Sequence, residues 1–214
     1  MKKSSLLSAI VISLGLVSAG SANAFSISMV ADNDFAIFGG TATGINDLLY
    51  QNNVVWNSQI SNLSTMTFAL PSTDTMFYVL AMGGGGQENI SGVINGVNIT
   101  SPSVSVLMSQ NIRSYLTGYD VNTVTTGAYS PTLTNVQTAF SNSIWGAPVL
   151  NTTDIVIQAG GFGSGFHFDD STAHLFSFNA ADVGVQAVPE PASLALLGLG
   201  LAGLGLSRRK NKQQ

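Results

Sequence analysis

Apolar residues alternate with polar ones, or form short runs rich in β-branched and aromatic side chains, in several parts of the chain. The segments that fit a β-strand best are residues 25–30, 65–70, 76–82, 104–108, 154–159 and 174–178. Turn-forming residues separate them, such as Pro71-Ser72-Thr73-Asp74 and the glycine run at 83–86. Many short strands with close turns are typical of a β-sandwich or jelly roll. We therefore expect residues 25–187 to form one mainly β domain of that kind.

Two local patterns add detail to this domain. Asn95-Gly96 lies between two β-rich stretches, which predicts a hairpin with a type I′ turn. Ser130-Pro131 is typical of a helix start, with Ser130 as the N-cap, and apolar residues then recur near the helical period. We expect a single short amphipathic helix over about residues 132–142, lying across one end of the sheets.

The N-terminal segment has the three parts of a secretory signal peptide. Lys2 and Lys3 precede an apolar run at residues 6–17, and small residues then lead to Ala22-Asn23-Ala24. The run is short for a membrane span, whereas the A-x-A pattern of Ala22 and Ala24 fits a cleavage site. We expect the general secretion machinery to export the chain, and cleavage after Ala24 to leave Phe25 as the first mature residue.

The C-terminal segment, residues 188–214, combines three features in order. Pro189-Glu190-Pro191 is followed by an apolar run at 192–206 and then by Arg208-Arg209-Lys210. Such a run predicts a short transmembrane helix, and the basic cluster predicts that its end stays in the cytoplasm. Composition alone fits a permanent anchor and a removable sorting tag equally well.

This C-terminal order resembles the PEP-CTERM sorting signal of bacterial exported proteins. The resemblance implies that Pro189, Glu190 and Pro191 are recognised by an exosortase, an inner-membrane transpeptidase. It also implies a Gram-negative bacterium that makes extracellular polysaccharide, a precursor held transiently in the inner membrane, and a final location at the cell surface or outside the cell.

Charge and cysteine content exclude several functions. Only 8% of the residues are charged, and the chain has no cysteine, so disulfides, thiolate metal sites and cysteine nucleophiles are excluded. Between residues 25 and 188 there are ten acidic residues and one basic residue, Arg113, which gives a net charge of −9. Nucleic acid and anionic membrane surfaces are therefore poor partners. About a third of this stretch is Ser, Thr, Asn or Gln, which favours strands over helices held by Glu–Lys pairs.

Both histidines of the chain, His167 and His174, lie close together in the sequence around Asp169-Asp170. Three interpretations stay open. His167, Asp169 and His174 would suit a zinc ion, and Asp169 and Asp170 with loop carbonyls would suit calcium. The third interpretation is a solvated turn at 169–172, because Asp and Ser side chains bond to their own backbone. We favour the turn and expect no metal and no other cofactor.

Other candidate chemistry is sparse. The glycine runs at 83–86 and 160–165 lack the Lys-Ser/Thr of a phosphate loop, so we interpret them as turns and close approaches. Ser164 lacks the full nucleophile-elbow pattern, although a hydrolase using Ser164 with His167 or His174 stays a minor alternative. Glu88, the only glutamate of the domain, is expected on an exposed loop. No catalytic residue is predicted.

Aromatic side chains leave sugar binding open. Trp56 and Trp145 have faces that can stack on sugar rings, and we expect core burial for both, with Trp145 the better candidate for exposure. The segments 67–71, 78–81 and 131–145 resemble galactose-binding-like sandwich domains, which implies a jelly roll and no catalytic residues. We expect a non-enzymatic surface or matrix protein associated with exopolysaccharide in a biofilm, with a carbohydrate-binding module as the alternative.

Overall fold

The computed structural model of the chain describes residues 24–61, 65–71, 73–86, 88–153 and 161–185. Residues Asn23–Ala187 form one compact unit. The predicted strand at 154–159, the predicted signal peptide up to residue 23 and the C-terminal segment lie outside the described residues. Among the residues described, no helix combines the length and the apolar character needed to cross a membrane.

Strands dominate the described chain. They are β1 (Ala24–Ala31), β2 (Asp34–Thr41), β3 (Gly44–Gln51), β4 (Thr65–Ala69), β5 (Met76–Met82), β6 (Glu88–Ile94), β7 (Val97–Asn98), β8 (Val106–Ser109), β9 (Trp145–Gly146), β10 (Val149–Asn151), β11 (Gly165–Phe168) and β12 (Ala173–Asn179). The helices are α2 (Trp56–Ser61), α3 (Val121–Thr125) and α4 (Leu133–Ser141), with 3₁₀ turns at Arg113–Tyr115 and Ala180–Val183. The expectation of a mainly β domain is confirmed, and the expectation of a single helix is wrong.

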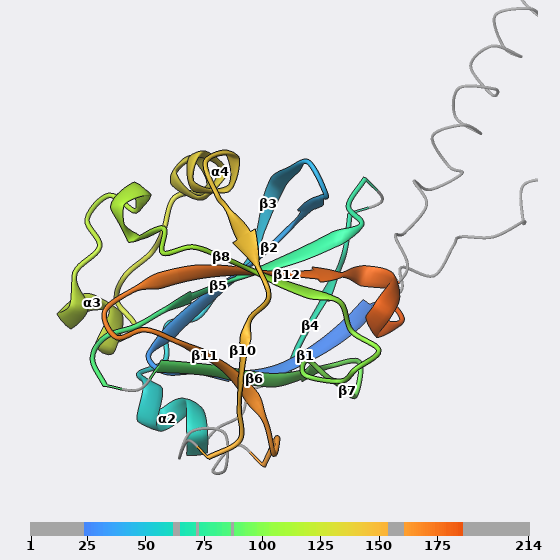
Figure 1. Cartoon of the computed structure of the whole chain (residues 1–214), viewed down its shortest axis with the longest axis horizontal. Helices are drawn as coiled ribbons and strands as arrows, with labels where there is room; N and C mark the ends of the chain where they lie inside the picture. The colour runs from blue at the N-terminus through green and yellow to red at the C-terminus, as the bar shows by residue number, and fades with distance from the viewer. Residues whose placement is uncertain (1–23, 62–64, 72, 87, 154–160, 186–214) are drawn as a thin grey trace, which may run out of the picture. The chain divides into compact units, whose positions relative to one another are not determined.

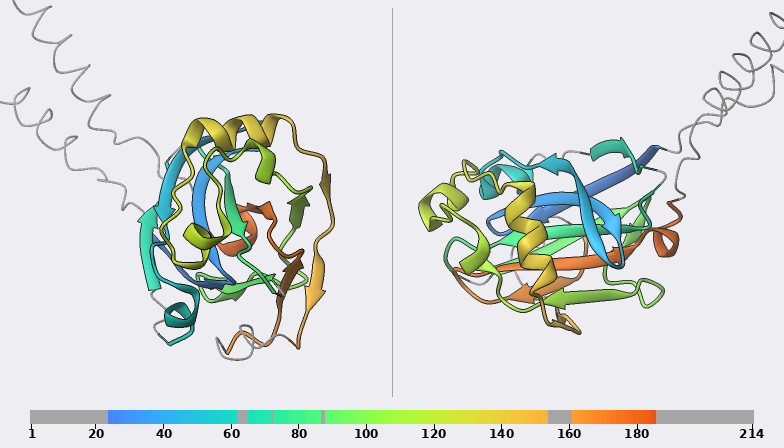
Figure 2. Two further views of the ribbon diagram at one scale, coloured as in Figure 1. Left: turned by 90° about the vertical axis from the view of Figure 1, so that its left-hand side faces the viewer. Right: turned by 90° about the horizontal axis from the view of Figure 1, so that it is seen from above.

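The strands form two antiparallel sheets that face each other (Figures 1 and 2). In the first sheet the order is β10-β11-β6-β1-β4, with β7 paired to β6. In the second sheet the order is β3-β2-β5-β12-β8-β9. The short segment from β9 to β10 runs from the edge of the second sheet to the edge of the first, so it links the two along one side (Figure 1).

The core between the sheets follows the period of two that a strand imposes. Phe25, Ile27 and Met29 of β1 belong to this core, as do alternate residues of β2, β5 and β12 in the opposite sheet. Phe25 is 1% exposed, and its ring centroid lies 4.7 Å from that of Phe68 and 4.5 Å from that of Phe77. The first strand is therefore fixed in the core from its second residue onward.

A second apolar cluster covers the outer face of the second sheet. The residues that alternate with the inner ones, such as Phe38, Tyr78 and Leu80, are also buried, and they pack with Val136 and Ala139 of α4. Helix α4 therefore runs across the face of this sheet (Figure 2) and not across one end of the sheets, as the sequence led us to expect. The physical reason is that β2, β5 and β12 are apolar on both faces, so the outer face also has to be covered.

Local hydrogen bonds set the helix ends. Helix α4 begins after Thr132, whose hydroxyl accepts a 3.3 Å bond from the backbone N–H of Asn135. The prediction of Ser130 as N-cap is wrong by two residues, because the chain becomes helical only after Thr132. Helix α3, which the sequence did not suggest, begins after Asp120, whose carboxylate accepts from the backbone N–H groups of Asn122 and Thr123.

The predicted hairpin is confirmed. Asn95 and Gly96 have φ angles of 49° and 77°, and Ile94 pairs with Val97 across the turn. Both central residues thus have the positive φ that a type I′ turn requires. Asn95 is bonded further, since its side chain accepts a 3.0 Å bond from the Ser26 N–H and donates a 3.1 Å bond to the Val183 carbonyl.

Candidate functional site

The two histidines lie on different sheets. His174 is in β12 and is 5% exposed; its Nδ1 lies 2.8 Å from the Ser109 carbonyl and its Nε2 lies 3.0 Å from the Thr172 hydroxyl. Burial lowers the pKa of His174 below its ordinary value. Both ring nitrogens thus have partners in the fold, and the neutral form is favoured.

His167 lies in β11, with its Nδ1 3.1 Å from the Glu88 carbonyl oxygen. Asp169 and Asp170 are exposed in the turn between β11 and β12, where the Ser171 hydroxyl donates a 2.8 Å bond to Asp170. Among the described residues no group of three His, Asp or Glu side chains comes together in a way that suits a metal ion. The structure thus places the 169–172 segment in a turn and does not bring His167, Asp169 and His174 together as the zinc interpretation needs.

Ser164 has a neighbour other than histidine. Its hydroxyl is hydrogen-bonded to that of Thr100. His167 is directed instead to the backbone of β6. The pairing of serine and histidine that the hydrolase alternative needs is therefore not formed in this arrangement.

Glu88 lies inside the fold, so the expectation of an exposed loop acid is wrong. It is 0% exposed at the start of β6, where its Oε1 accepts a 2.7 Å bond from the Gly85 N–H and its Oε2 a 3.1 Å bond from the Asn33 amide. The preceding glycines make room for it, since a Cβ on Gly83 would lie 2.8 Å from the Glu88 Cγ. Burial is the main cause that raises the pKa of Glu88 to about 7.

A second buried carboxyl, Asp34, has no counterpart in the sequence-based predictions. It is 0% exposed at the start of β2; its Oδ1 accepts from the Asn52 amide at 2.7 Å and from the Phe35 N–H at 2.8 Å. Among the described residues Oδ2 has no hydrogen-bond partner. Burial raises the pKa of Asp34 to about 7. The apolar run that directly follows Asp34 in the sequence is the feature that could have indicated its burial.

Gln59 of α2 connects the backbone around these two carboxyls. Its amide nitrogen donates to the Asn33 carbonyl at 2.8 Å, and its amide oxygen accepts from the Ala31 N–H at 3.1 Å. This pairing satisfies backbone groups where the chain passes from β1 in one sheet to β2 in the other. The hydrogen bonds of Gln59 thus stabilise the backbone of this crossover.

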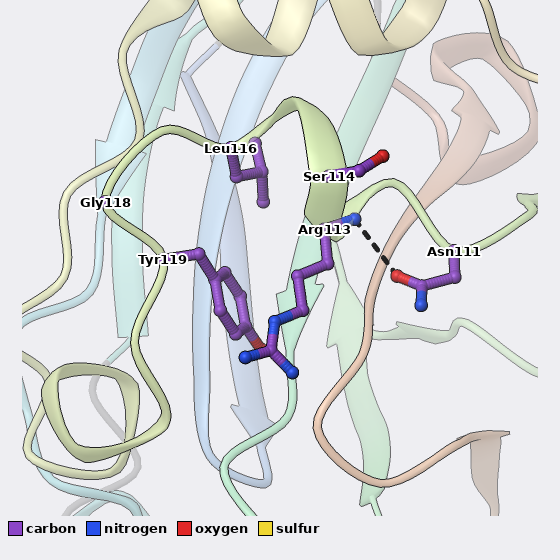
Figure 3. Close-up of a pocket in the computed structure, with 6 residues that line it drawn as sticks. All are labelled: Asn111, Arg113, Ser114, Leu116, Gly118 and Tyr119. Carbon is purple, nitrogen blue, oxygen red and sulfur yellow. Dashed lines mark hydrogen bonds between the residues drawn. The ribbon is translucent and has the colours of Figure 1, made fainter.

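A pocket of about 430 Å³ lies beside the 3₁₀ turn Arg113–Tyr115 (Figure 3). It is lined by Asn111, Arg113, Ser114, Leu116, Gly118 and Tyr119. The Arg113 guanidinium carbon lies 4.9 Å from the centroid of the Tyr119 ring, a cation–π distance. Its Nη1 donates a 2.8 Å bond to the Ser171 carbonyl. The sequence singled out Arg113 by its charge but did not place it in a pocket.

Tyr119 forms the other wall of this pocket. Its hydroxyl donates to the Gly83 carbonyl at 2.6 Å and lies 3.0 Å from the Thr172 carbonyl oxygen. Burial is the main cause that raises the pKa of the Tyr119 phenol above its ordinary range. The phenol is therefore a fixed neutral donor.

A smaller cavity, of about 150 Å³, contains Trp145 in its wall. The Trp145 ring centroid lies 6.2 Å from that of Tyr78 and 5.7 Å from that of Phe140. Trp145 and Trp56 are both half-buried. Trp145 therefore packs on the outer apolar cluster and is neither fully buried nor fully exposed, the two outcomes considered from the sequence.

Comparison with known proteins adds one match. Residues 187–210 match the PEP-CTERM protein-sorting motif. No curated protein matches the chain. No solved structure matches it either, and the resemblance to galactose-binding-like domains is not confirmed.

The matched segment contains Pro189, Glu190 and Pro191, which lie outside the described residues and whose recognition role stays a prediction. The same holds for Ala22 and for the cleavage after Ala24. The motif itself implies processing by exosortase and a membrane-anchored precursor in a Gram-negative bacterium. The chain therefore carries a PEP-CTERM sorting signal, which supports an exported protein that is sorted by an exosortase.

Proposed function

We propose that this protein is a non-catalytic component of the cell surface or extracellular matrix that associates with the exopolysaccharide of the producing cell. The PEP-CTERM motif at residues 187–210 is the observation that carries the proposal, because it directs the chain to the outside of a Gram-negative cell. The β domain is then the part that meets the polymer.

The arrangement of the polar side chains supports a non-catalytic role. The two ring nitrogens of His174 contact Ser109 and Thr172, and the Ser164 hydroxyl contacts Thr100. A hydrolase needs its base within about 3 Å of the group that it activates. The candidate base and nucleophile of this chain have other partners instead.

The composition of the domain supports contact with a polymer of sugars. About a third of residues 25–188 are Ser, Thr, Asn or Gln, and these side chains exchange hydrogen bonds with hydroxyl groups without the need for a charged partner. The single basic residue disfavours dense polyanions. A polysaccharide rich in hydroxyl groups remains the best-matched partner outside the cell.

Co-sedimentation tests this function. The protein, purified after export, is mixed with exopolysaccharide from the producing strain and centrifuged, with dextran as the control polymer. We expect the protein in the pellet with its own polysaccharide and in the supernatant with dextran. Equal behaviour with both polymers would contradict the association, and release of new reducing ends from the polysaccharide would contradict the non-catalytic role.

A further inference from the structure

We propose that the pocket of Arg113 and Tyr119 binds an acidic sugar residue, a uronic acid, through its carboxylate. This inference rests on the proposed function, because that function supplies the polysaccharide; the inference adds which kind of sugar the domain binds. It is argued from three features of the pocket: a cation that has no carboxylate partner among the described residues, an aromatic ring beside this cation, and the side-chain amide of Asn111.

Arg113 is the only basic residue between residues 25 and 188. Among the described residues no carboxylate forms an ion pair with it; its contacts are the Ser171 carbonyl and the Tyr119 ring. A guanidinium has five N–H donors, and the bond to Ser171 uses one of them. The remaining donors can form the paired hydrogen bonds that a carboxylate accepts.

The position of the cation is fixed before a ligand arrives. Figure 3 shows the side chains of Arg113 and Tyr119 extending in the same direction from neighbouring parts of the chain. Tyr119 is anchored through its hydroxyl to Gly83, and Arg113 is anchored through Nη1 to Ser171. A preorganised guanidinium loses less side-chain entropy when it binds a carboxylate than a free one does.

The remaining lining suits a sugar ring. Asn111 lies on the side of Arg113 away from Tyr119 (Figure 3), and its Oδ1 accepts the backbone N–H groups of Arg113 at 3.0 Å and Ala173 at 3.2 Å. Its orientation is therefore fixed, and its amide nitrogen is a donor for a ring hydroxyl. Leu116 adds an apolar wall, and the volume of about 430 Å³ lies in the usual range for small-ligand sites.

The surrounding charge selects among anions. The domain carries a net charge of −9, so a dense polyanion would be repelled everywhere except at Arg113. An isolated carboxylate on an otherwise neutral sugar chain brings one charge to one cation. Uronic acids spaced by neutral sugars fit this condition, whereas polyphosphate and nucleic acid do not.

Calorimetry with three small probes tests the site: sodium glucuronate, glucose and sodium acetate, each added to the protein purified after export. We expect binding of glucuronate and at least tenfold weaker binding of glucose and acetate, because each of these lacks part of the recognised group. If acetate binds as well as glucuronate, the pocket takes any carboxylate and the sugar assignment is overturned. Absence of glucuronate binding overturns the proposal altogether.

Two substitutions locate the binding. Arg113→Gln is expected to weaken glucuronate binding by about tenfold or more, because it removes the charge-assisted bonds. Asn57→Asp changes the net charge by the same amount at an exposed position of α2 and should leave binding unchanged. Circular dichroism and the thermal midpoint show whether the Arg113 variant is folded. If it is not folded, Arg113→Lys replaces it, with weaker binding expected because lysine lacks the planar fork.

Failure of the site and failure of the function give different results. If Arg113→Gln still sediments with the exopolysaccharide and still binds glucuronate, the site is wrong and the proposed function stands. If glucuronate binds in an Arg113-dependent way but the wild-type protein does not sediment with the exopolysaccharide, the site stands and the proposed polymer is wrong.

Discussion

The side-chain amide of Asn52 donates a 2.7 Å hydrogen bond to Oδ1 of Asp34 inside the domain, while Oδ2 of the same carboxyl has no partner among the described residues. The hydrogen bonds to Oδ1 offset only part of the free-energy cost of burying this charged carboxylate. Burial therefore raises the pKa of Asp34 from 3.8 to about 7 and that of Glu88, which accepts a hydrogen bond from Asn33 next to Asp34, from 4.5 to about 7.

The first prediction concerns pH. A carboxyl with a raised pKa binds its proton more tightly in the folded state, so its contribution to stability is complete below the unfolded pKa near 4 and is lost as pH rises through about 7. We expect the free energy of unfolding to be larger at pH 5 than at pH 8, with a slope of up to about 1.4 kcal/mol per pH unit for each group. Urea unfolding across this range measures it.

Asp34→Asn should remove the part of this slope that Asp34 causes, leaving the part that Glu88 causes. The exposed Asp47 provides the matched control, and Asp47→Asn should leave the slope unchanged. The same slope in Asp34→Asn as in the wild-type protein would show that Asp34 does not titrate in this way.

The second prediction concerns the outer apolar cluster. Phe38 of β2 is fully buried in this cluster, so Phe38→Ala should destabilise the domain by about 3–5 kcal/mol. Leu150 is 58% exposed, and Leu150→Ala should change the stability by less than about 0.5 kcal/mol. Thermal or urea unfolding compares the two. Equal effects would mean that the outer cluster is not a packed core.

The third prediction concerns the hairpin between β6 and β7. Gly96 has a φ of 77°, and Gly96→Ala should cost about 1–2 kcal/mol because a Cβ is unfavourable in that conformation. A Cβ on Gly146 would have no atom within 4 Å, so Gly146→Ala should be neutral or slightly stabilising, by up to about 1 kcal/mol. Equilibrium unfolding of both variants gives the sign, and a neutral Gly96 variant would argue against the type I′ turn.

The fourth prediction concerns sorting. With Pro189, Glu190 and Pro191 all replaced by alanine, the protein should accumulate in the membrane fraction with its C-terminal segment intact. The wild-type protein should lose the segment that begins near Pro189. Intact-mass measurement after fractionation distinguishes the forms, and Pro148→Ala, outside the matched motif, controls for the loss of a proline. Normal release of the triple variant would contradict recognition of these residues by the exosortase.

Local patterns predicted those elements whose own sequence carries the signal. Strand β5 was predicted as residues 76–82 and lies at Met76–Met82, because its seven residues are apolar and rich in β-formers. Strand β2 was missed, because it begins with Asp34 and ends in Gly39-Gly40-Thr41, which interrupts a strand pattern. It forms because β3 and β5 pair with it on both sides, so tertiary pairing outweighs local propensity.

The polar interior was less accessible to sequence reasoning. Glu88 follows a glycine run, which suggested a solvated loop, yet those glycines are what allow the backbone to close around the carboxyl. The sequence shows Arg113 as a lone basic residue, but Tyr119 and Asn111 meet it only through the fold of the 110–120 loop. The sequence does predict the sorting motif that matches at residues 187–210, since its parts are consecutive and need no tertiary contact.

The place of Phe25 has a consequence for the predicted cleavage after Ala24. In the folded domain Ala24 pairs with Ala69, and the Phe25 ring lies between Phe68 and Phe77. A protease that cuts after Ala24 must hold these same residues in its own cleft, and they cannot occupy the cleft and the sheet at once. If the chain is cut after Ala24, as its sequence predicts, the cut has to come before β1 docks in the first sheet.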